Sequence, residues 1–213
     1  GAASFTAGTL ECANTFAGVS PDPRGLFISR DISAKNFIVQ TSSYLTCGSV
    51  KLTVSNDLVN AGTVNAGASV LAITSDFENT GIFYAENGTA TVGRNFVNSG
   101  SYNGGSGILN VSGNFSNGGT YDAGTSTVKL TSTGISVIEG ESAFYAFECI
   151  VPGKIIKFQN GIAQVGNGKA DDNGGENIPD HVKYQGKFIG IDNTENDKGN
   201  YGTGTKKQHL KRM

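Results

Sequence analysis

The sequence predicts an all-β chain that folds as a parallel β-solenoid, in which short strands stack coil upon coil. Three observations carry this prediction. One short motif occurs four times at a constant spacing, so that Leu58, Phe77, Phe96 and Phe115 are equivalent. Apolar residues alternate with polar ones inside each repeat, which is the period of a strand and not of a helix. Glycine and asparagine recur at fixed places between these stretches, where a coil must turn.

The motif sets the length of one coil. It occupies residues 57–64, 76–83, 95–102 and 114–121. A fixed period near twenty residues is typical of proteins in which each repeat forms one turn of a stacked coil. A short alternating pair such as Leu71 and Ile73 precedes each motif, which gives each coil at least two strands. In-register stacking would place successive coils about 4.8 Å apart.

Stacking turns each equivalent position into a column along the rod. The apolar column comprises Leu58, Phe77, Phe96 and Phe115, and the amide column comprises Asn60, Asn79, Asn98 and Asn117. A side-chain amide has two donors and an acceptor, so each Asn can bond the amides above and below it. We interpret the Asn column as structural, and the alternative is a row that binds a ligand.

Two further columns follow the same spacing. One is mostly aromatic and comprises Val64, Phe83, Tyr102 and Tyr121. The other comprises Gly62, Gly81, Gly100 and Gly119. Glycine tolerates both positive φ and close backbone approach, so we expect this column at a corner that needs one or the other.

The repeats also resemble a known family. Residues 95–102 followed by 108–111 resemble the short repeats of filamentous-haemagglutinin-type adhesins and other bacterial surface β-solenoids, and residues 125–130 followed by 135–150 are similar to their closing coil. The resemblance covers about residues 36–158. It implies a right-handed parallel β-helix that is exported and has a structural or adhesive role. Such repeats specify a fold better than they specify an activity.

In order along the chain, we expect three parts. Residues 1–30 lack the repeat and would cap the first coil or dock on another molecule, because the ends of a solenoid expose unpaired backbone and core. Residues 31–160 would form about seven coils, regular over 57–132, in a rod roughly 30–35 Å long. Residues 161–213 form a tail rich in Gly, Asn and Lys, which we expect to dock on a neighbouring subunit, and the alternative is docking on its own rod.

The tail contains one alternating apolar stretch, at residues 181–191. Such a strand could pair with a sheet edge of an adjacent molecule. The basic end of the chain could meet an acidic patch there, and the alternative is a solvated basic end. The expected subunit contacts are Val182, Tyr184, Phe188, Ile189, Ile191, Lys206, Lys207, Lys211 and Arg212.

Composition narrows the classes of function. Only 16% of the 213 residues are charged and the formal net charge is −2, which argues against a nucleic-acid partner. No apolar run approaches eighteen residues, so we expect no membrane-spanning helix. The chain starts at Gly1 without Met, which we interpret as the removal of a signal peptide or a tag.

The cysteines and the glycosylation motifs leave alternatives open. Cys12, Cys47 and Cys149 have no metal-site spacing. Either all three are buried thiols or one disulfide forms, for which Cys12 and Cys47 are the candidates. Three Asn-X-Ser/Thr motifs begin at Asn87, Asn110 and Asn114, and an Asn- and Ser-rich chain contains such motifs by chance.

We find no residues that predict an enzyme. The two histidines, His181 and His209, are in no nucleophile motif. Asp57 and Asp76 occupy equivalent positions one coil apart, a separation within the range of a retaining glycosidase pair. The same column continues as Asn95 and Asn114, which favours turn capping over acid–base chemistry.

Two weaker patterns concern other ligands. Residues 171–180 are similar to the Asp-rich calcium repeats of extracellular proteins, and Asp171, Asp172 and Asp180 would be the ligands. Asn177 replaces the usual glycine of those repeats, so a plain polar turn is the other interpretation. We expect no other cofactor. Paired threonines such as Thr89 and Thr91 suit an ice-binding face, but the coil that contains Ile108 interrupts the row.

We therefore expect a secreted structural protein of the cell surface. Solenoids with open ends and heterologous end contacts form fibres, so this chain would join copies of itself into a filament, surface layer or matrix. The alternative is a rod module of an adhesin that binds cell-surface glycans, which an exposed aromatic row would favour. A third possibility is a β-helical polysaccharide-active enzyme, which needs a carboxylate cluster.

Overall fold

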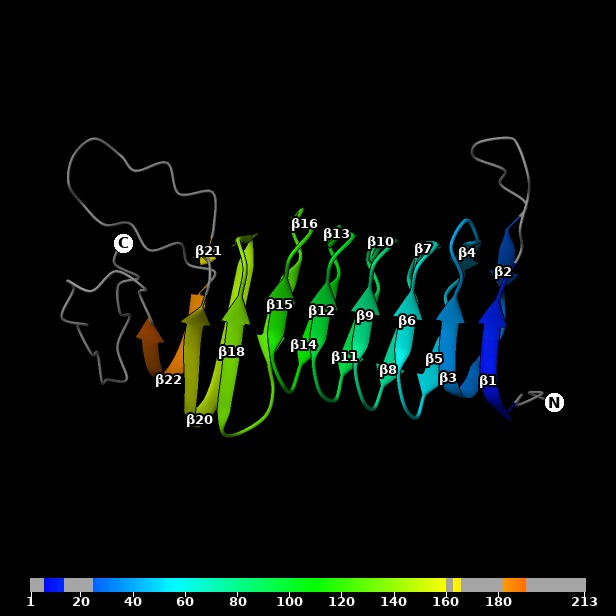
Figure 1. The fold of residues 1–213 in the computed structure, drawn as a ribbon. Coiled ribbons are helices and arrows are strands. Elements are labelled where there is room, and N and C mark those ends of the chain that lie inside the picture. Colours follow the sequence, from blue (N-terminus) through cyan, green and yellow to red (C-terminus); the bar gives the residue numbers. More distant parts are fainter. Residues whose placement is uncertain (1–5, 14–24, 160–162, 166–181, 191–213) are drawn as a thin grey trace.

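The computed structural model describes residues 6–13, 25–159, 163–165 and 182–190. Within these residues every regular element is a β-strand and every strand pairing is parallel. The strands stack into a β-solenoid of about seven coils, which confirms the predicted fold class (Figure 1). In the described part of the chain, no helix is long and apolar enough to cross a membrane.

Each regular coil contributes three short strands, which stack into three columns. Column a contains β5 (Lys51–Val54), β8 (Val70–Ile73), β11 (Thr89–Val92), β14 (Ile108–Val111) and β17 (Thr127–Leu130). Column b contains β6 (Leu58–Asn60), β9 (Phe77–Asn79), β12 (Phe96–Asn98), β15 (Phe115–Asn117) and β18 (Ile135–Glu139). Column c contains β2 (Leu26–Ile28), β4 (Tyr44–Cys47), β7 (Thr63–Asn65), β10 (Ile82–Tyr84), β13 (Ser101–Asn103) and β16 (Thr120–Asp122).

Longer strands at both ends of the rod run through columns a and b together. They are β1 (Thr6–Cys12), β3 (Ile32–Val39), β20 (Ala146–Gln159) and β22 (Val182–Gly190), and they unite the two columns in one sheet. Column c forms a second sheet, of six strands. A separate pair, β19 (Ser142–Phe144) and β21 (Ala163–Val165), follows it, so the hydrogen-bonded ladder of column c ends at β16.

The register between coils follows the repeat period. Phe96 pairs with Phe77 on one side and with Phe115 on the other, which are its equivalents in the two neighbouring repeats. The steps from Phe37 to Leu58 and from Phe115 to Ile138 are both longer than this period, yet each pair is in register. The extra residues lie in the corners, so the inward rows continue through both irregular steps.

The core is one apolar cluster that extends along the rod. Phe77, Phe96 and Phe115 are fully buried in it. The rings of Phe77 and Phe96 meet edge to face, whereas those of Tyr102 and Tyr121 stack at 5.5 Å with an angle of 2° between their planes. Ring pairs of both kinds contribute about 0.5–1.5 kcal/mol each beyond burial.

The corner between columns b and c depends on glycine because the backbones of successive coils touch there. A Cβ on Gly100 would lie 2.1 Å from the carbonyl oxygen of Gly81, and a Cβ on Gly119 would lie 2.1 Å from that of Gly100. None of these three glycines has a positive φ. Crowding, and not backbone handedness, therefore explains this glycine column.

The corner between columns c and a depends on positive φ instead. Gly67, Gly105 and Gly124 have φ of 57°, 55° and 55°. At each of these corners the side-chain oxygen of an Asn or Asp accepts a hydrogen bond from the glycine N–H, as from Gly67 to Asn65 at 3.0 Å. The equivalent turn after β10 has Tyr84 in place of the Asn or Asp, and Glu86 takes a φ of 53° there without being glycine.

Candidate functional site

The Asn column forms a continuous chain of hydrogen bonds inside the rod. Nδ2 of Asn60, Asn79 and Asn98 each donates to Oδ1 of the next Asn, at 2.7 Å in all three cases. The second Nδ2 hydrogen of each goes to a backbone oxygen of the next coil, such as Ser101 O at 3.0 Å from Asn79. At the end, Asn117 donates to the carbonyl oxygen of Glu141.

This geometry leaves the Asn column no capacity for a ligand. The four side chains are between 0% and 4% exposed. Buried amides gain from such complete pairing, since an unpaired buried donor or acceptor costs about 1–3 kcal/mol. The column is therefore structural, and the ligand-binding alternative does not fit it.

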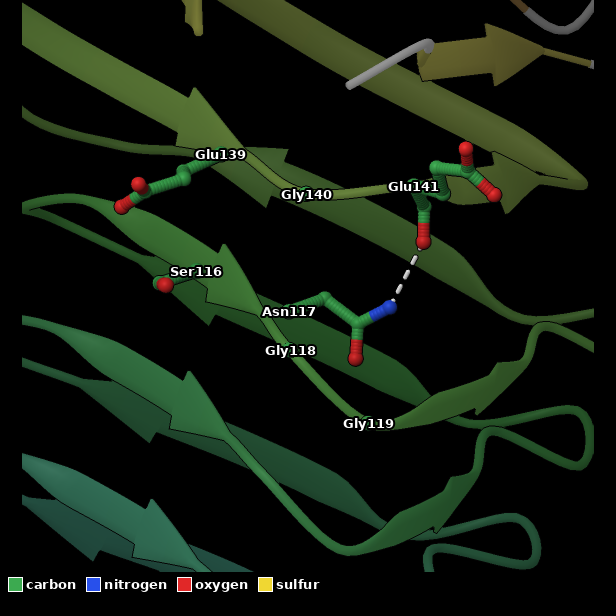
Figure 2. A pocket seen from close by; sticks show the side chains of 7 residues that line it. All are labelled: Ser116, Asn117, Gly118, Gly119, Glu139, Gly140 and Glu141. Atoms are coloured by element: carbon green, nitrogen blue, oxygen red, sulfur yellow. Dashed lines mark hydrogen bonds between the residues drawn. The ribbon is translucent and has the colours of Figure 1, made fainter. Parts of the chain in front are cut away.

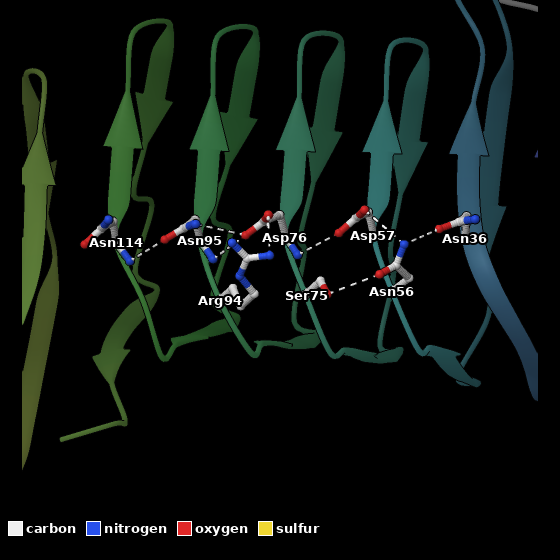
Figure 3. A network of polar contacts seen from close by, with 8 residues as sticks. All are labelled: Asn36, Asn56, Asp57, Ser75, Asp76, Arg94, Asn95 and Asn114. Atoms are coloured by element: carbon white, nitrogen blue, oxygen red, sulfur yellow. Dashed lines mark hydrogen bonds and ion pairs between the residues drawn. The ribbon is translucent and has the colours of Figure 1, made fainter. Parts of the chain in front are cut away.

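A second polar row runs along the outside of the rod, at the start of column b (Figure 3). Its members are Asn36, Asp57, Asp76, Asn95 and Asn114. Oδ1 of Asp57, Asp76 and Asn95 each accepts a hydrogen bond from the backbone N–H of the next member, at 2.9–3.1 Å. Asn114 in turn accepts from the N–H of Val137 at 2.9 Å.

The carboxylates of Asp57 and Asp76 both accept hydrogen bonds within this row. Each accepts from the backbone N–H at the start of a column b strand in the next coil. Arg94 lies 3.7 Å from the other oxygen of Asp76. Asn95 accepts the equivalent hydrogen bond with its amide oxygen, so the row needs an acceptor oxygen and not a negative charge. The arrangement is one of capping.

Two further carboxylates lie beside an open hollow of about 480 Å³ (Figure 2). Its lining comprises Ser116, Asn117, Gly118, Gly119, Glu139, Gly140 and Glu141. The hollow lies at the longer step between β15 and β18. The side chains of Glu139 and Glu141 point away from each other (Figure 2).

Lys154 is a buried cation that the repeat pattern does not predict. It lies within β20 at the corner between columns a and b, and it is 0% exposed. Its Nζ donates to the carbonyl oxygen of Ser132 at 2.8 Å and to the hydroxyl of Ser132 at 3.3 Å. Burial lowers the pKa of Lys154 from its ordinary value, and the neighbouring Cys149 opposes this shift. Only the break in the repeat after Ser132 indicated a special position.

The three cysteines are buried thiols, and the Cys12–Cys47 disulfide is not formed. Burial raises the pKa of the Cys47 thiol to about 11, and it also raises that of Cys149. Neutral thiols are poor nucleophiles and poor metal ligands. These side chains therefore act as small apolar core residues.

The remaining expected sites lie mostly outside the described residues. Those outside are His181, His209, Asp171, Asp172, Asp180, Ile191, Lys206, Lys207, Lys211 and Arg212. Val182, Tyr184, Phe188 and Ile189 belong to β22, which pairs in parallel with β20 of the same chain. Among the described residues, no three His, Cys, Asp or Glu side chains form a metal-binding group. The threonine face is interrupted, since Ile108 pairs between Thr89 and Thr127.

The two ends of the rod carry the most unusual surface. β1 and β2 are the terminal strands at one end, while β21 and β22 are terminal at the other (Figure 1). Leu26 of β2 occupies an inward row, in register with Leu45, which is 1% exposed. Leu26 itself is 41% exposed and its neighbour Phe27 is 60% exposed. At this end Leu26 is therefore exposed on an inward row, whereas Ile28 of the same strand is buried.

Comparisons with other proteins do not add to this geometry. No protein-family model matches the chain, and comparisons with curated proteins and with solved structures found no significant match.

Proposed function

We propose that this chain is a structural subunit that assembles end to end into a filament, surface layer or matrix. The observation that carries the proposal is the exposed core residue Leu26 at an end of the rod. Soluble solenoids need polar terminal repeats to cover the last coil. An exposed apolar residue beside a terminal strand that pairs on one edge only among the described residues is instead a surface that another coil would stabilise.

The polarity of the strands supports head-to-tail joining. All described pairings are parallel, so the outer edges of β1 and β22 can extend the same ladder in the same direction. A contact between two different ends is heterologous, and it repeats without closing when no rotation brings it back. A filament is the expected product of such a contact.

The proposal includes a location at the cell surface, which rests on the resemblance to filamentous-haemagglutinin-type repeats. The rod module of a glycan-binding adhesin is the alternative. It receives no support from the exposed aromatic residues among those described, since Phe27 and Tyr84 are separated by two coils with Thr46 and Asn65 in the same row. A polysaccharide-active enzyme likewise lacks a supporting carboxylate cluster in the described part.

Negative-stain electron microscopy of three purified chains tests this proposal. We expect filaments from the full chain and single short rods from a chain that ends at Asn160, which lacks β21 and β22. A chain that ends at Gly190 separates the contribution of β22 from that of the residues after it. Single short rods from the full chain would overturn the proposal and favour the adhesin module, for which glycan binding would be measured next.

A further inference from the structure

One row of register positions can be followed through the strand pairings from one end of the rod to the other. It begins at Thr9, which pairs with Asn36, and it continues through the polar row of Figure 3. It then passes through Val137 and Lys157 and ends at Ile189 in β22. The two ends of the molecule therefore present the same row, at Thr9 and at Ile189.

Column c has a matching pair of ends. Leu26 begins its inward row and pairs with Leu45. At the other end, β21 pairs with β19, and the ring of Phe144 in β19 lies 5.6 Å from that of Tyr121. The strand pair of β19 and β21 thus follows column c at the end opposite to Leu26.

From this continuity we infer the register of the joint between two copies, an inference that rests on the proposed function. β22 of one copy pairs with β1 of the next, so that Ile189 lies beside Thr9, and β21 lies over β2, so that it covers Leu26. The occupant of the open end is therefore a second copy of this chain. The joint buries the one inward-row leucine that the isolated rod leaves 41% exposed.

Engineered cysteines measure this register directly. Neighbouring residues of adjacent strands have Cα atoms about 4.8 Å apart, which a disulfide can bridge. We expect Thr9→Cys/Ile189→Cys to give covalent multimers larger than dimers after mild oxidation, on a non-reducing gel. Each single variant has one new thiol per chain and is expected to give no multimers beyond dimers. Glu78→Cys/Ile189→Cys is the matched control, because Glu78 is exposed on β9 in the middle of the rod.

A second measurement tests the role of Leu26. An unpaired charge buried at the joint is costly, so Leu26→Asp is expected to raise the critical concentration for filaments at least about tenfold. Ile135→Asp is the control, since Ile135 is 54% exposed on β18, away from the end that Leu26 occupies. Circular dichroism of both variants checks that the β-structure is retained.

The outcomes separate this inference from the proposed function. Absence of filaments from the wild-type chain would overturn both. If the wild-type chain forms filaments but Thr9→Cys/Ile189→Cys gives no multimers, only the register inferred here is overturned. The same holds if the Glu78→Cys/Ile189→Cys control gives as many multimers as Thr9→Cys/Ile189→Cys. Efficient dimers from Thr9→Cys alone, with no multimers from the double variant, would show head-to-head joining and would also overturn it.

Discussion

At the scale of single residues, the crowded corner between columns b and c offers a sharp test. Gly119→Ala would place a Cβ 2.1 Å from the oxygen of Gly100, and the backbone would have to move. We expect a loss of roughly 1–3 kcal/mol in the free energy of unfolding, as for other overpacked sites. Chemical denaturation monitored by circular dichroism measures this loss.

Gly118 provides the matched control one residue away. A Cβ there would have no neighbour closer than 4.0 Å, and the equivalent residues Ala61, Thr80 and Ser99 all carry side chains. Gly118→Ala is therefore expected to change stability by no more than about 0.5 kcal/mol. Equal effects of the two substitutions would show that crowding does not explain the glycine column.

Lys154 gives a second prediction at this scale, through pH. Its pKa in the folded chain is lower than the ordinary 10.5, so the unfolded chain holds this proton to higher pH. Between the two pKa values the unfolded state binds more protons, and stability from this group rises with pH. The stability of wild type minus that of Lys154→Met should therefore increase as the pH rises toward 10.5.

The measurement is urea denaturation across alkaline pH in a Cys149→Ser background, which removes the titration of the thiol beside Lys154. Both proteins share every other titrating group, so their difference isolates Lys154. A difference that stays constant with pH would contradict the lowered pKa. If the stability of Lys154→Met rose relative to that of wild type with increasing pH, the pKa of Lys154 would be raised and not lowered.

At the scale of elements, the Asn column joins consecutive strands of column b from inside. Asn79→Leu would leave Asn98 Oδ1 and Ser101 O without the donor they share. Because each unpaired buried group costs about 1–3 kcal/mol, we expect a loss of roughly 2–4 kcal/mol in thermal or urea unfolding. Asn110→Ala, on the outer face of β14, is the control and should cost less than about 0.5 kcal/mol. Equal losses would contradict the buried ladder.

The elements also show what a sequence of this kind can reveal. The constant spacing of the motif predicted the strands of the regular coils and their register, because stacking makes each period equivalent. It did not predict the longer step from Phe115 to Ile138, because the alternation of residues within a strand does not determine the length of the corner between strands. The sequence pattern also did not predict the burial of Lys154, because its partner Ser132 lies in a coil without repeat symmetry. Similarly, alternation predicted the strand in β22, but it did not decide between the chain's own rod and a neighbouring subunit as its partner, and the partner is β20 of the same chain.

At the scale of the whole molecule, a solenoid is a sum of similar layers. Each coil contacts its neighbours and little else, so stability is approximately additive over repeats. Deletion of residues 76–94 removes one full period of the repeat and brings Asn95 into the place of Asp76. We expect a folded rod about 4.8 Å shorter, with an unchanged β-sheet signal and a lower free energy of unfolding.

Deletion of residues 76–85 is the control that separates periodicity from mere length. It removes fewer residues, but it joins Ser75 directly to Glu86. The turn that begins at Glu86 then stands where the column b strand should begin. The inward rows are then interrupted, and even a shift of register by one residue turns the buried side chains of a strand toward solvent. Circular dichroism and urea unfolding should therefore show a cooperative fold for the longer deletion and none for the shorter. The opposite order would mean that the stacked rows do not determine the fold of this rod.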